Sequence, residues 1–366
     1  MPHGNAIRAL EYDVVLATRN RPEALALSVP LLLAQTRAPK RLIVIDSSDA
    51  HGTVATVVRR AAAGWAGDLI IRRSPPGLPT QRNHGLRLAG SPIVFFLDDD
   101  SLLYPDAAEE ILAIYEKDTN GRITGVCAAE ATAPPDSANL GAGYAMSPAH
   151  RREARLRRMR NGVERRLTGL KPAMHLGRRL NARHGVPDWL AERNAVVVEY
   201  MTGFRMTFRM DAIRAGGFDE ALAGYALDED VDASFTAARS GLVVGAQKAR
   251  IYHHRCPGGR GDDFVRGRME VLNRAYVLLK HATGAAGSPA LAVSVWKRQA
   301  AFMTLKLVAL APRVVTRSGR ARFAGAWSGR RQALRLWSAG PGDRAAIMAG
   351  ADPPRPGSTV SAVAGA

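Results

Sequence analysis

Short, nearly uninterrupted apolar runs alternate with helix-length segments between residues 12 and 97 of this chain. The runs have the length of strands and lie at residues 12–17, 41–46, 68–73 and 92–97. The predicted helices between them lie at residues 22–35, 53–65 and 79–89. Strands that are apolar on both faces and separated by helices form a parallel sheet covered on both sides. We therefore predict an α/β fold with a mostly parallel, Rossmann-like central sheet flanked by helices.

Polar clusters directly follow three of these strands. The clusters are Thr18-Arg19-Asn20-Arg21, Asp46-Ser47-Ser48-Asp49 and Asp98-Asp99-Asp100. In sheets of this kind the ligand crevice lies beyond the carboxyl ends of the strands. We expect a ligand site on this rim of the sheet.

Composition narrows the class of protein. Hydrophobic residues make up 46% of the 366 residues and charged residues 23%, which excludes wholesale disorder. The net charge of +18 favours partners that carry phosphate. The two cysteines are too few for a disulfide framework or a four-cysteine zinc site. No secretory signal and no spanning apolar segment is recognisable, so we expect a cytoplasmic location.

Two acidic clusters and a histidine pair could carry chemistry. In extended backbone Asp98 and Asp100 point the same way, so they could share a divalent cation; a solvated loop that caps the next helix is the alternative. The second cluster, residues 228–232, could supply a general base or could simply favour a helix N-terminus. The pair His253-His254 could complete a metal site, although such a pair is more often a surface feature.

In their order and spacing these motifs resemble the family 2 glycosyltransferases, and in particular bacterial rhamnosyltransferase-like enzymes. The matching stretches are VVLATRNRP (14–22), LIVIDSSD (42–49), PTQRNHGLRLAGSPIVFFLDDDSLLYPDA (79–107), GGFDEALAGYALDEDVDASFTAARSG (216–241), IYHHRC (251–256) and FVRGRMEVLNRAYVLLK (264–280). The resemblance implies the GT-A nucleotide-diphospho-sugar transferase fold and a nucleotide-sugar donor.

The resemblance also implies roles for single residues. Asp98 and Asp100 match the DXD motif that holds Mg²⁺ or Mn²⁺ against the donor diphosphate, with Asp99 between them on the donor side. A late metal-ligand histidine matches His253 best and His254 next. Asp230 matches the catalytic base. The remaining matches are the acceptor-orienting Glu229, the acceptor-side Gly203 and Asp228, and the donor-side Thr18, Arg19, Asn20, Asp46, Arg82 and Asn83.

These matches imply an inverting, metal-dependent hexosyl- or deoxyhexosyltransferase. Its acceptor would be a hydroxyl of a glycan or of a polyprenyl-diphosphate-linked glycan, in cell-envelope or extracellular polysaccharide synthesis. One alternative is a sugar-nucleotidyltransferase, but the glycine-rich N-terminal signature of those enzymes is absent from VVLATRNRP. The other is a non-catalytic basic module that binds membrane or nucleic acid, which would leave the acidic clusters unexplained.

The sequence divides into five parts on these grounds. We expect a nucleotide-sugar-binding half at residues 1–133, a basic helical insertion at 134–197 and a catalytic half at 198–284. A basic amphipathic helical extension at 285–350 and a disordered tail at 351–366 follow. Leu, Met and Trp alternate with Arg in the basic parts, which favours peripheral binding to anionic lipid at the inner face of the cell membrane over nucleic acid.

Overall fold

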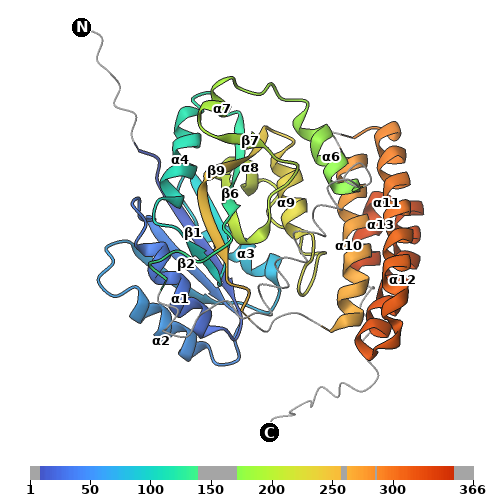
Figure 1. Cartoon of the computed structure of the whole chain (residues 1–366), viewed down its shortest axis with the longest axis horizontal. Coiled ribbons are helices and arrows are strands. Elements are labelled where there is room, and N and C mark those ends of the chain that lie inside the picture. Colours follow the sequence, from blue (N-terminus) through green and yellow to red (C-terminus); the bar gives the residue numbers. More distant parts are fainter. Residues whose placement is uncertain (1–8, 139–170, 257–261, 285–286, 350–366) are drawn as a thin grey trace.

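The computed structural model describes residues 9–138, 171–256, 262–284 and 287–349. Within these residues the strands form one sheet in the order β3-β2-β1-β4-β8-β6-β9-β5, and β7 pairs with β9. Figure 1 shows the sheet with helices on both sides and a group of long helices at the right. The Arg-rich part of the predicted insertion (139–170) and the predicted tail (351–366) lie outside the described residues.

The parallel part of the sheet follows the apolar runs of the sequence. Its strands are β1 (Tyr12–Thr18), β2 (Arg41–Asp46), β3 (Asp68–Arg73) and β4 (Ile93–Asp98), and each neighbouring pair among them is parallel. The central strands β1, β2 and β4 are buried along almost their whole length because helices cover both faces. The predicted α/β fold class is confirmed.

The other half of the sheet mixes directions. β8 (Met206–Arg209) runs antiparallel to β4 and to β6 (Ile123–Glu130), and β6 runs parallel to β9 (Leu242–His253). Two short strands, β5 (Ser101–Leu103) and β7 (Ala195–Val197), are antiparallel to β9. β9 is twelve residues long. Its length lets one strand reach from the middle of the sheet to the rim.

Two hydrophobic cores lie on opposite faces of the sheet. Val14 and Leu16 of β1 belong to one core, with α1 (Pro22–Leu33), α2 (His51–Ala61) and α4 (Ala107–Lys117). Val15 belongs to the other, with α3 (Leu78–Leu88), α8 (Met210–Arg214) and α9 (Glu229–Ala237). Successive side chains of a strand point to opposite faces, so one continuous apolar run serves both cores.

The remaining helices complete the fold, most of them at the right of Figure 1. They are α6 (Pro172–Asn181), α7 (Trp189–Glu192), α10 (Asp263–Thr283), α11 (Pro289–Leu310), α12 (Arg317–Ser338) and α13 (Pro341–Ala349), with the short turns η2 (Gly203–Arg205) and η3 (Ala311–Val315). No described helix is both long enough and apolar enough to cross a membrane.

Glycines allow α10 and α12 to approach closely. A Cβ atom added at Gly267 of α10 would lie 2.2 Å from the carbonyl oxygen of Arg322. A Cβ atom at Gly325 of α12 would lie 2.0 Å from the carbonyl oxygen of Phe264. Both distances are far below any real contact and involve backbone, so only glycine fits at these two positions.

Candidate active site

The aspartate triplet forms the turn between β4 and β5. Asp98 is the last residue of β4, and Ser101 begins β5 opposite His253 of β9. The hydroxyl of Ser101 donates to the carbonyl of Phe204 at 2.7 Å and accepts from the N–H of Asp98 at 3.2 Å. The pairing of β5 with β9 therefore holds the triplet beside the end of β9.

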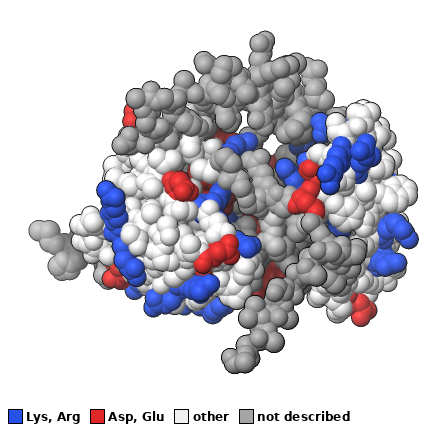
Figure 2. All heavy atoms as spheres, turned by 90° about the horizontal axis from the view of Figure 1, so that it is seen from below, with Lys and Arg blue, Asp and Glu red and all other residues white. Residues whose placement is uncertain are grey.

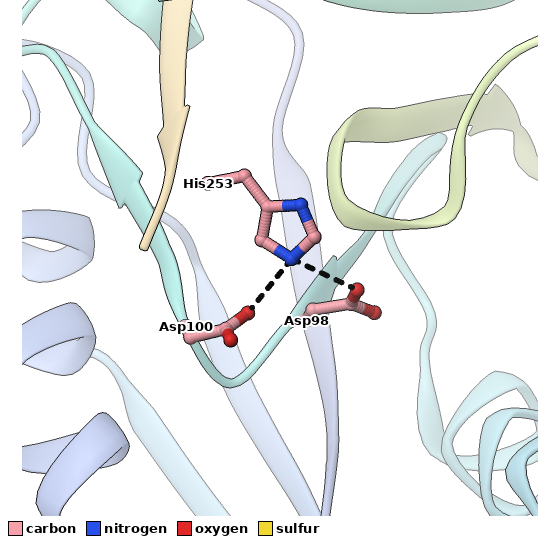
Figure 3. A group of neighbouring side chains, drawn as sticks. All are labelled: Asp98, Asp100 and His253. Atoms are coloured by element: carbon pink, nitrogen blue, oxygen red, sulfur yellow. Dashed lines mark ion pairs between the residues drawn. The ribbon is translucent and has the colours of Figure 1, made fainter. Parts of the chain in front are cut away.

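Asp98, Asp100 and His253 form a compact cluster. The Nε2 atom of His253 lies 3.2 Å from Oδ1 of Asp100 and 4.0 Å from Oδ2 of Asp98, as Figure 3 shows. The ring of His253 stacks on Phe204 with the centroids 4.4 Å apart, which fixes its orientation. Burial raises the pKa of Asp100 and lowers the pKa of His253. The pairing of the two side chains outweighs burial, so the pKa of Asp100 lies below its usual value and the pKa of His253 lies above its usual value.

The cluster fits a divalent cation. One ligand atom from each of Asp98, Asp100 and His253 lies within 4.8 Å of the others. Oδ1 of Asp100 is buried and has no hydrogen-bond partner among the described residues, although a buried carboxylate oxygen normally has one. Two carboxylates and an imidazole are common ligands of divalent ions.

His254 does not belong to this group. Its backbone N–H donates to the carbonyl of Asp100 at 3.0 Å, and its ring makes a tilted contact with Tyr252 rather than with Phe204. Of the two histidines considered as ligands, the structure places His253 among the carboxylates.

Asp99 faces away from the cluster. Its carboxylate accepts a hydrogen bond from the Thr18 hydroxyl at 2.8 Å and one from Nη1 of Arg21 at 2.7 Å. Nη2 of Arg21 also lies 3.1 Å from Oδ2 of Asp100. Burial raises the pKa of Asp99 to about 7, although Arg21 opposes that shift. Asp99 thus anchors the triplet to the end of β1 instead of facing the same space as its neighbours.

Arg82 of α3 joins the cluster to the second acidic group. This buried side chain donates from Nη2 to Asp98 at 3.0 Å and to the carbonyl of Gly203 at 3.0 Å. Its Nη1 forms a short ion pair with Glu229. Burial raises the pKa of Glu229 to about 8, and the pairing with Arg82 opposes that shift. One guanidinium therefore binds a carboxylate at the end of β4 and a carboxylate at the start of α9.

Asp230 lies at the N-terminus of α9, next to the same glycine. The N–H of Gly203 donates to Oδ2 of Asp230 at 3.0 Å. Burial, followed by the charge of Asp228, raises the pKa of Asp230 to about 6. Asp228 has a left-handed backbone with φ of 72° and accepts two hydrogen bonds from Arg274 of α10. Gly203 therefore contacts Asp230 through its N–H and Arg82 through its carbonyl.

The expected nucleotide-side residues lie at the ends of β1 and β2. Asn20 has a left-handed backbone and binds Ser48 and Asp49, while Arg19 is exposed. Asp46 is fully buried, and its two oxygens accept from the N–H of Ser48 at 2.8 Å and from Nδ1 of His51 at 2.6 Å. In this position Asp46 presents no atom to solvent.

Asn83 is placed away from the cluster. Its side chain exchanges two hydrogen bonds with the backbone of Phe218, and its amide donates to Glu220 at 2.9 Å. It thereby ties α3 to the segment that follows α8. The structure brings together Asp98, Asp100, His253, Arg82, Gly203, Glu229 and Asp230, and it leaves Asn83, Asp46, Arg19 and His254 outside that group.

Sequence reasoning missed four residues around the site: Arg21, His51, Phe204 and Arg274. Arg21 belongs to a polar cluster that the sequence did single out, so its position was a usable signal. His51 lies five residues beyond Asp46, where a turn into α2 brings it back to that carboxylate. Nothing in the sequence pairs Arg274 with Asp228, because they lie 46 residues apart on different helices.

Comparison with known proteins supports the resemblance seen in the sequence. The sequence model of the family described as Glycosyl transferase family 2 matches residues 13–163. S. aureus TarS 1–349 is 13% identical with a TM-score of 0.53, over 93% of this chain and 87% of that chain. A mannosyltransferase from Pyrobaculum calidifontis, PcManGT in complex with GDP-Man and Mn²⁺, is 16% identical with a TM-score of 0.49, over 93% and 86%. No curated protein sequence matches the chain. Residues 13–163 therefore resemble the family 2 glycosyltransferases, and the described residues adopt the GT-A fold.

Proposed function

We propose that this protein is an inverting, metal-dependent glycosyltransferase. It would move a hexosyl or deoxyhexosyl group from a nucleotide-diphosphate donor to a hydroxyl of a glycan or polyprenyl-diphosphate-linked acceptor, in cell-envelope or extracellular polysaccharide synthesis. The observation that carries the proposal is the chain of contacts from the Asp98–Asp100–His253 cluster through Arg82 and Gly203 to Asp230.

The donor diphosphate would lie at the cluster. Asp98, Asp100 and His253 are the residues that would hold Mg²⁺ or Mn²⁺, and the ion would neutralise charge on the departing diphosphate. Asp98 is about one-third exposed, so it can face a ligand, whereas Asp100 is buried and fixed by Arg21. Arg82 keeps Asp98 in place and adds positive charge behind the two carboxylates.

Asp230 would act as the general base. A carboxyl group with a pKa of about 6 is ionised at neutral pH and still basic enough to accept a proton. The acceptor oxygen would form a bond to the anomeric carbon while the bond from that carbon to the diphosphate oxygen breaks. The hydroxyl proton passes to Asp230, and the nucleoside diphosphate leaves. One displacement of this kind inverts the anomeric centre.

Two ion pairs would shape the acceptor side. Glu229 is held by Arg82, and Asp228 is held by Arg274, so Asp230 lies between two fixed carboxylates. After burial, the negative charge of Asp228 is the main influence that favours the protonated form of Asp230 and raises its pKa. Glu229, Asp228 and Gly203 are accordingly the residues that we assign to positioning the acceptor.

The nucleotide would bind at the ends of β1 and β2, near Thr18, Arg19 and Asn20. Asp46 is buried, so we assign the contact with the base to His51 rather than to Asp46 itself. A carboxylate only accepts hydrogen bonds, so Nδ1 of His51 donates to Asp46. Nε2 of the same ring would be the atom that contacts the base.

A membrane is a further binding partner in the proposed function. A polyprenyl-linked acceptor resides in a bilayer, and the positive charge of this chain would favour the anionic inner face of a cell membrane. We therefore place the enzyme in the cytoplasm at that face. The excess of Lys and Arg supports this placement.

The proposed donor site can be tested by thermal unfolding. We expect UDP-, GDP- or dTDP-sugars of one nucleotide class to raise the unfolding temperature of the wild-type protein in the presence of Mn²⁺, and not without it. The Asp100→Ala variant should lose this response while remaining folded. Stabilisation that is independent of metal, or unchanged in Asp100→Ala, would contradict the proposed site.

A further inference from the structure

The corner at which α11 passes into α12 exposes apolar side chains. Val308 near the end of α11 is 65% exposed and Val315 of η3 is 79% exposed. Leu305 and Val314 are exposed as well. Leu305 and Val308 lie three residues apart on one helix face, and η3 continues directly from that helix end. We call these four residues, Leu305, Val308, Val314 and Val315, the apolar corner.

The outer face of α12 continues from this corner. Nη1 of Arg320 donates to the carbonyl oxygens of Val314 and Val315 at 3.2 and 3.3 Å, which ties the first turn of α12 to the corner. Exposed residues then recur at helical spacing and include the large apolar side chains of Trp327 and Leu334. We call Arg317, Arg320, Ala324, Trp327, Arg331 and Leu334 the α12 outer face.

This part of the chain is free of negative side chains. Between Glu270 and Asp343 the sequence has no aspartate or glutamate but twelve lysines and arginines. At the right of Figure 2, Lys and Arg side chains stand mostly among uncharged residues, with smaller areas of Asp and Glu beside them. A surface of one sign complements a surface of the opposite sign over distances of several ångströms. The apolar corner therefore lies within a strongly cationic stretch of the fold.

We propose that the apolar corner and the α12 outer face form a docking surface for an anionic lipid bilayer. The valines and Leu305 would enter the boundary between headgroups and acyl chains, and the arginines would bind lipid phosphates. Trp327 suits the interface because an indole ring has an apolar body and a polar N–H group. A nucleic acid would pair with the same arginines but would leave the valines in water, so the exposed apolar residues favour the bilayer.

The proposal concerns surface binding and not a spanning segment, since no described helix can cross a bilayer. It identifies the surface through which the proposed enzyme would bind the membrane. It rests on the proposed function only for its biological purpose. None of its residues belongs to the site around Asp98 and Asp230. Its test therefore requires no sugar transfer.

Vesicle flotation of the full-length protein tests this surface. We expect the wild type to float with vesicles that contain phosphatidylcholine and a substantial fraction of phosphatidylglycerol, and to float poorly with phosphatidylcholine alone. Asp230→Asn, which should abolish transfer, is expected to float like the wild type. Loss of activity and loss of membrane binding can thus be told apart.

Two sets of substitutions separate the apolar and cationic contributions. Val308→Ser, Val314→Ser and Val315→Ser combined should weaken vesicle binding by at least about 10-fold. Arg317→Gln with Arg331→Gln should weaken it by about 30-fold at low salt, from the typical contribution of a cation near an anionic surface. The matched controls are Val186→Ser and Arg59→Gln with Arg60→Gln, which change residues that are also exposed elsewhere on the fold.

Three results would overturn the proposal. The first is an absence of flotation with anionic vesicles at low salt. The second is a valine triple variant that floats as well as the Val186→Ser control, which would remove the apolar corner from the contact. The third is binding to a short DNA duplex or RNA with no binding to vesicles. Unfolding temperatures of all variants, with and without a donor, establish that each one is folded.

Discussion

The Nη2 atom of Arg82 lies 3.0 Å from Oδ1 of Asp98, and the same guanidinium pairs with Glu229. Arg82 comes from α3, Asp98 ends a parallel strand, and Glu229 begins α9. The Asp98–Asp100–His253 cluster and the acidic N-terminus of α9 are thus linked by one buried cation. A change at Arg82 should consequently affect both.

Replacing Arg82 should destabilise the fold. Arg82→Met leaves Glu229 buried without its partner, so the free energy of unfolding should fall by about 3–5 kcal/mol. Adding Glu229→Gln should recover part of that loss, because the uncompensated charge is removed. Chemical denaturation measures both effects. Arg178→Met, which breaks an exposed ion pair with Glu199, should cost at most about 1 kcal/mol; equal losses at the two positions would contradict the role given to burial.

Removing one carboxylate of the cluster should weaken metal binding. Asp100→Asn should lower the affinity for Mn²⁺ at least about 10- to 100-fold, the loss typical of disturbing even the outer partners of a metal site. Titration with Mn²⁺, followed by calorimetry or by the paramagnetic signal of the free ion, measures the change. Asp136→Asn, at an exposed position, is the control. An unchanged affinity in a folded Asp100→Asn protein would exclude this cluster as the metal site.

Asp230 should set the acidic limb of the pH profile. Its pKa is raised to about 6, so the base is protonated below that pH and ionised above it. We expect kcat/KM to rise with pH and to level off above about 6, and Asp230→Asn to lower kcat by about 10²- to 10⁴-fold. Donor binding should be retained in the variant. A profile that stays flat between pH 5 and 7 would remove Asp230 from the role of base.

The raised pKa of Asp230 also makes the free energy of unfolding depend on pH. Activity should rise with pH, whereas the contribution of Asp230 to stability should fall. The ordinary pKa of an aspartate is 3.8, and the pKa of Asp230 in the folded protein is about 6. At a pH between these two values the folded protein holds a proton on Asp230 that the unfolded chain has already lost. The contribution of this group to stability is therefore largest at low pH and is lost as the pH rises through 6. As the pH rises from about 4 to about 6, the free energy of unfolding should therefore fall less in Asp230→Asn than in the wild type, or should rise. Chemical denaturation at several pH values measures this difference.

His51 should affect the choice of nucleotide. If Nε2 accepts from a base N–H group, His51→Ala should raise the dissociation constant of the preferred nucleoside diphosphate about 3- to 10-fold, the value of one hydrogen bond. Nucleotides whose bases lack that N–H group should bind weakly to the wild type and should be insensitive to the substitution. Isothermal titration with UDP and with its N3-methylated analogue, whose base has no N–H group, compares the two cases. An equal loss for both would mean that His51 does not read the base.

The close contact of α10 and α12 gives a test of packing. Gly325→Ala would place a Cβ atom 2.0 Å from the backbone of Phe264, so we expect a loss of about 1–3 kcal/mol in the free energy of unfolding. Gly52→Ala in α2 meets no atom within 4 Å and should be neutral or stabilising by up to about 1 kcal/mol. Arg274 lies on α10, so Gly325→Ala should also weaken its ion pair with Asp228. Thermal unfolding of Gly325→Ala and Gly52→Ala, measured in parallel, compares the effects of the two substitutions on stability.

The parallel half of the fold was readable from the sequence because its signal is local. The predicted run 41–46 coincides with β2, since a strand inside a covered parallel sheet is apolar along most of its length. The run 68–73 coincides with β3, an edge strand that is only partly buried. β5 and β8 have only three and four residues, too few to show a period, and their places depend on partners elsewhere in the chain. Local patterns do not encode such pairings.

The candidate site was likewise predictable only where its residues give a local signal. The Asp98–Asp100 cluster stood out because charged groups at the end of a buried strand are unusual, and the family resemblance implied the roles of the acidic residues. Sequence could not tell that Asp46 is buried against His51, or that Asn83 binds the backbone of Phe218. The second contact joins elements 135 residues apart, whose relative position follows from tertiary packing. Exposure of a side chain is likewise a property of the folded chain.

The pairing of β5 with β9 has a consequence for protein synthesis. Asp98 and Asp100 are made early, but His253 emerges from the ribosome about 150 residues later, and β5 pairs only with that late strand among the described residues. A nascent chain can form the β1–β4 layer well before it can close the turn that carries the aspartates. The Asp98–Asp100–His253 cluster can therefore form only after most of the chain has been translated.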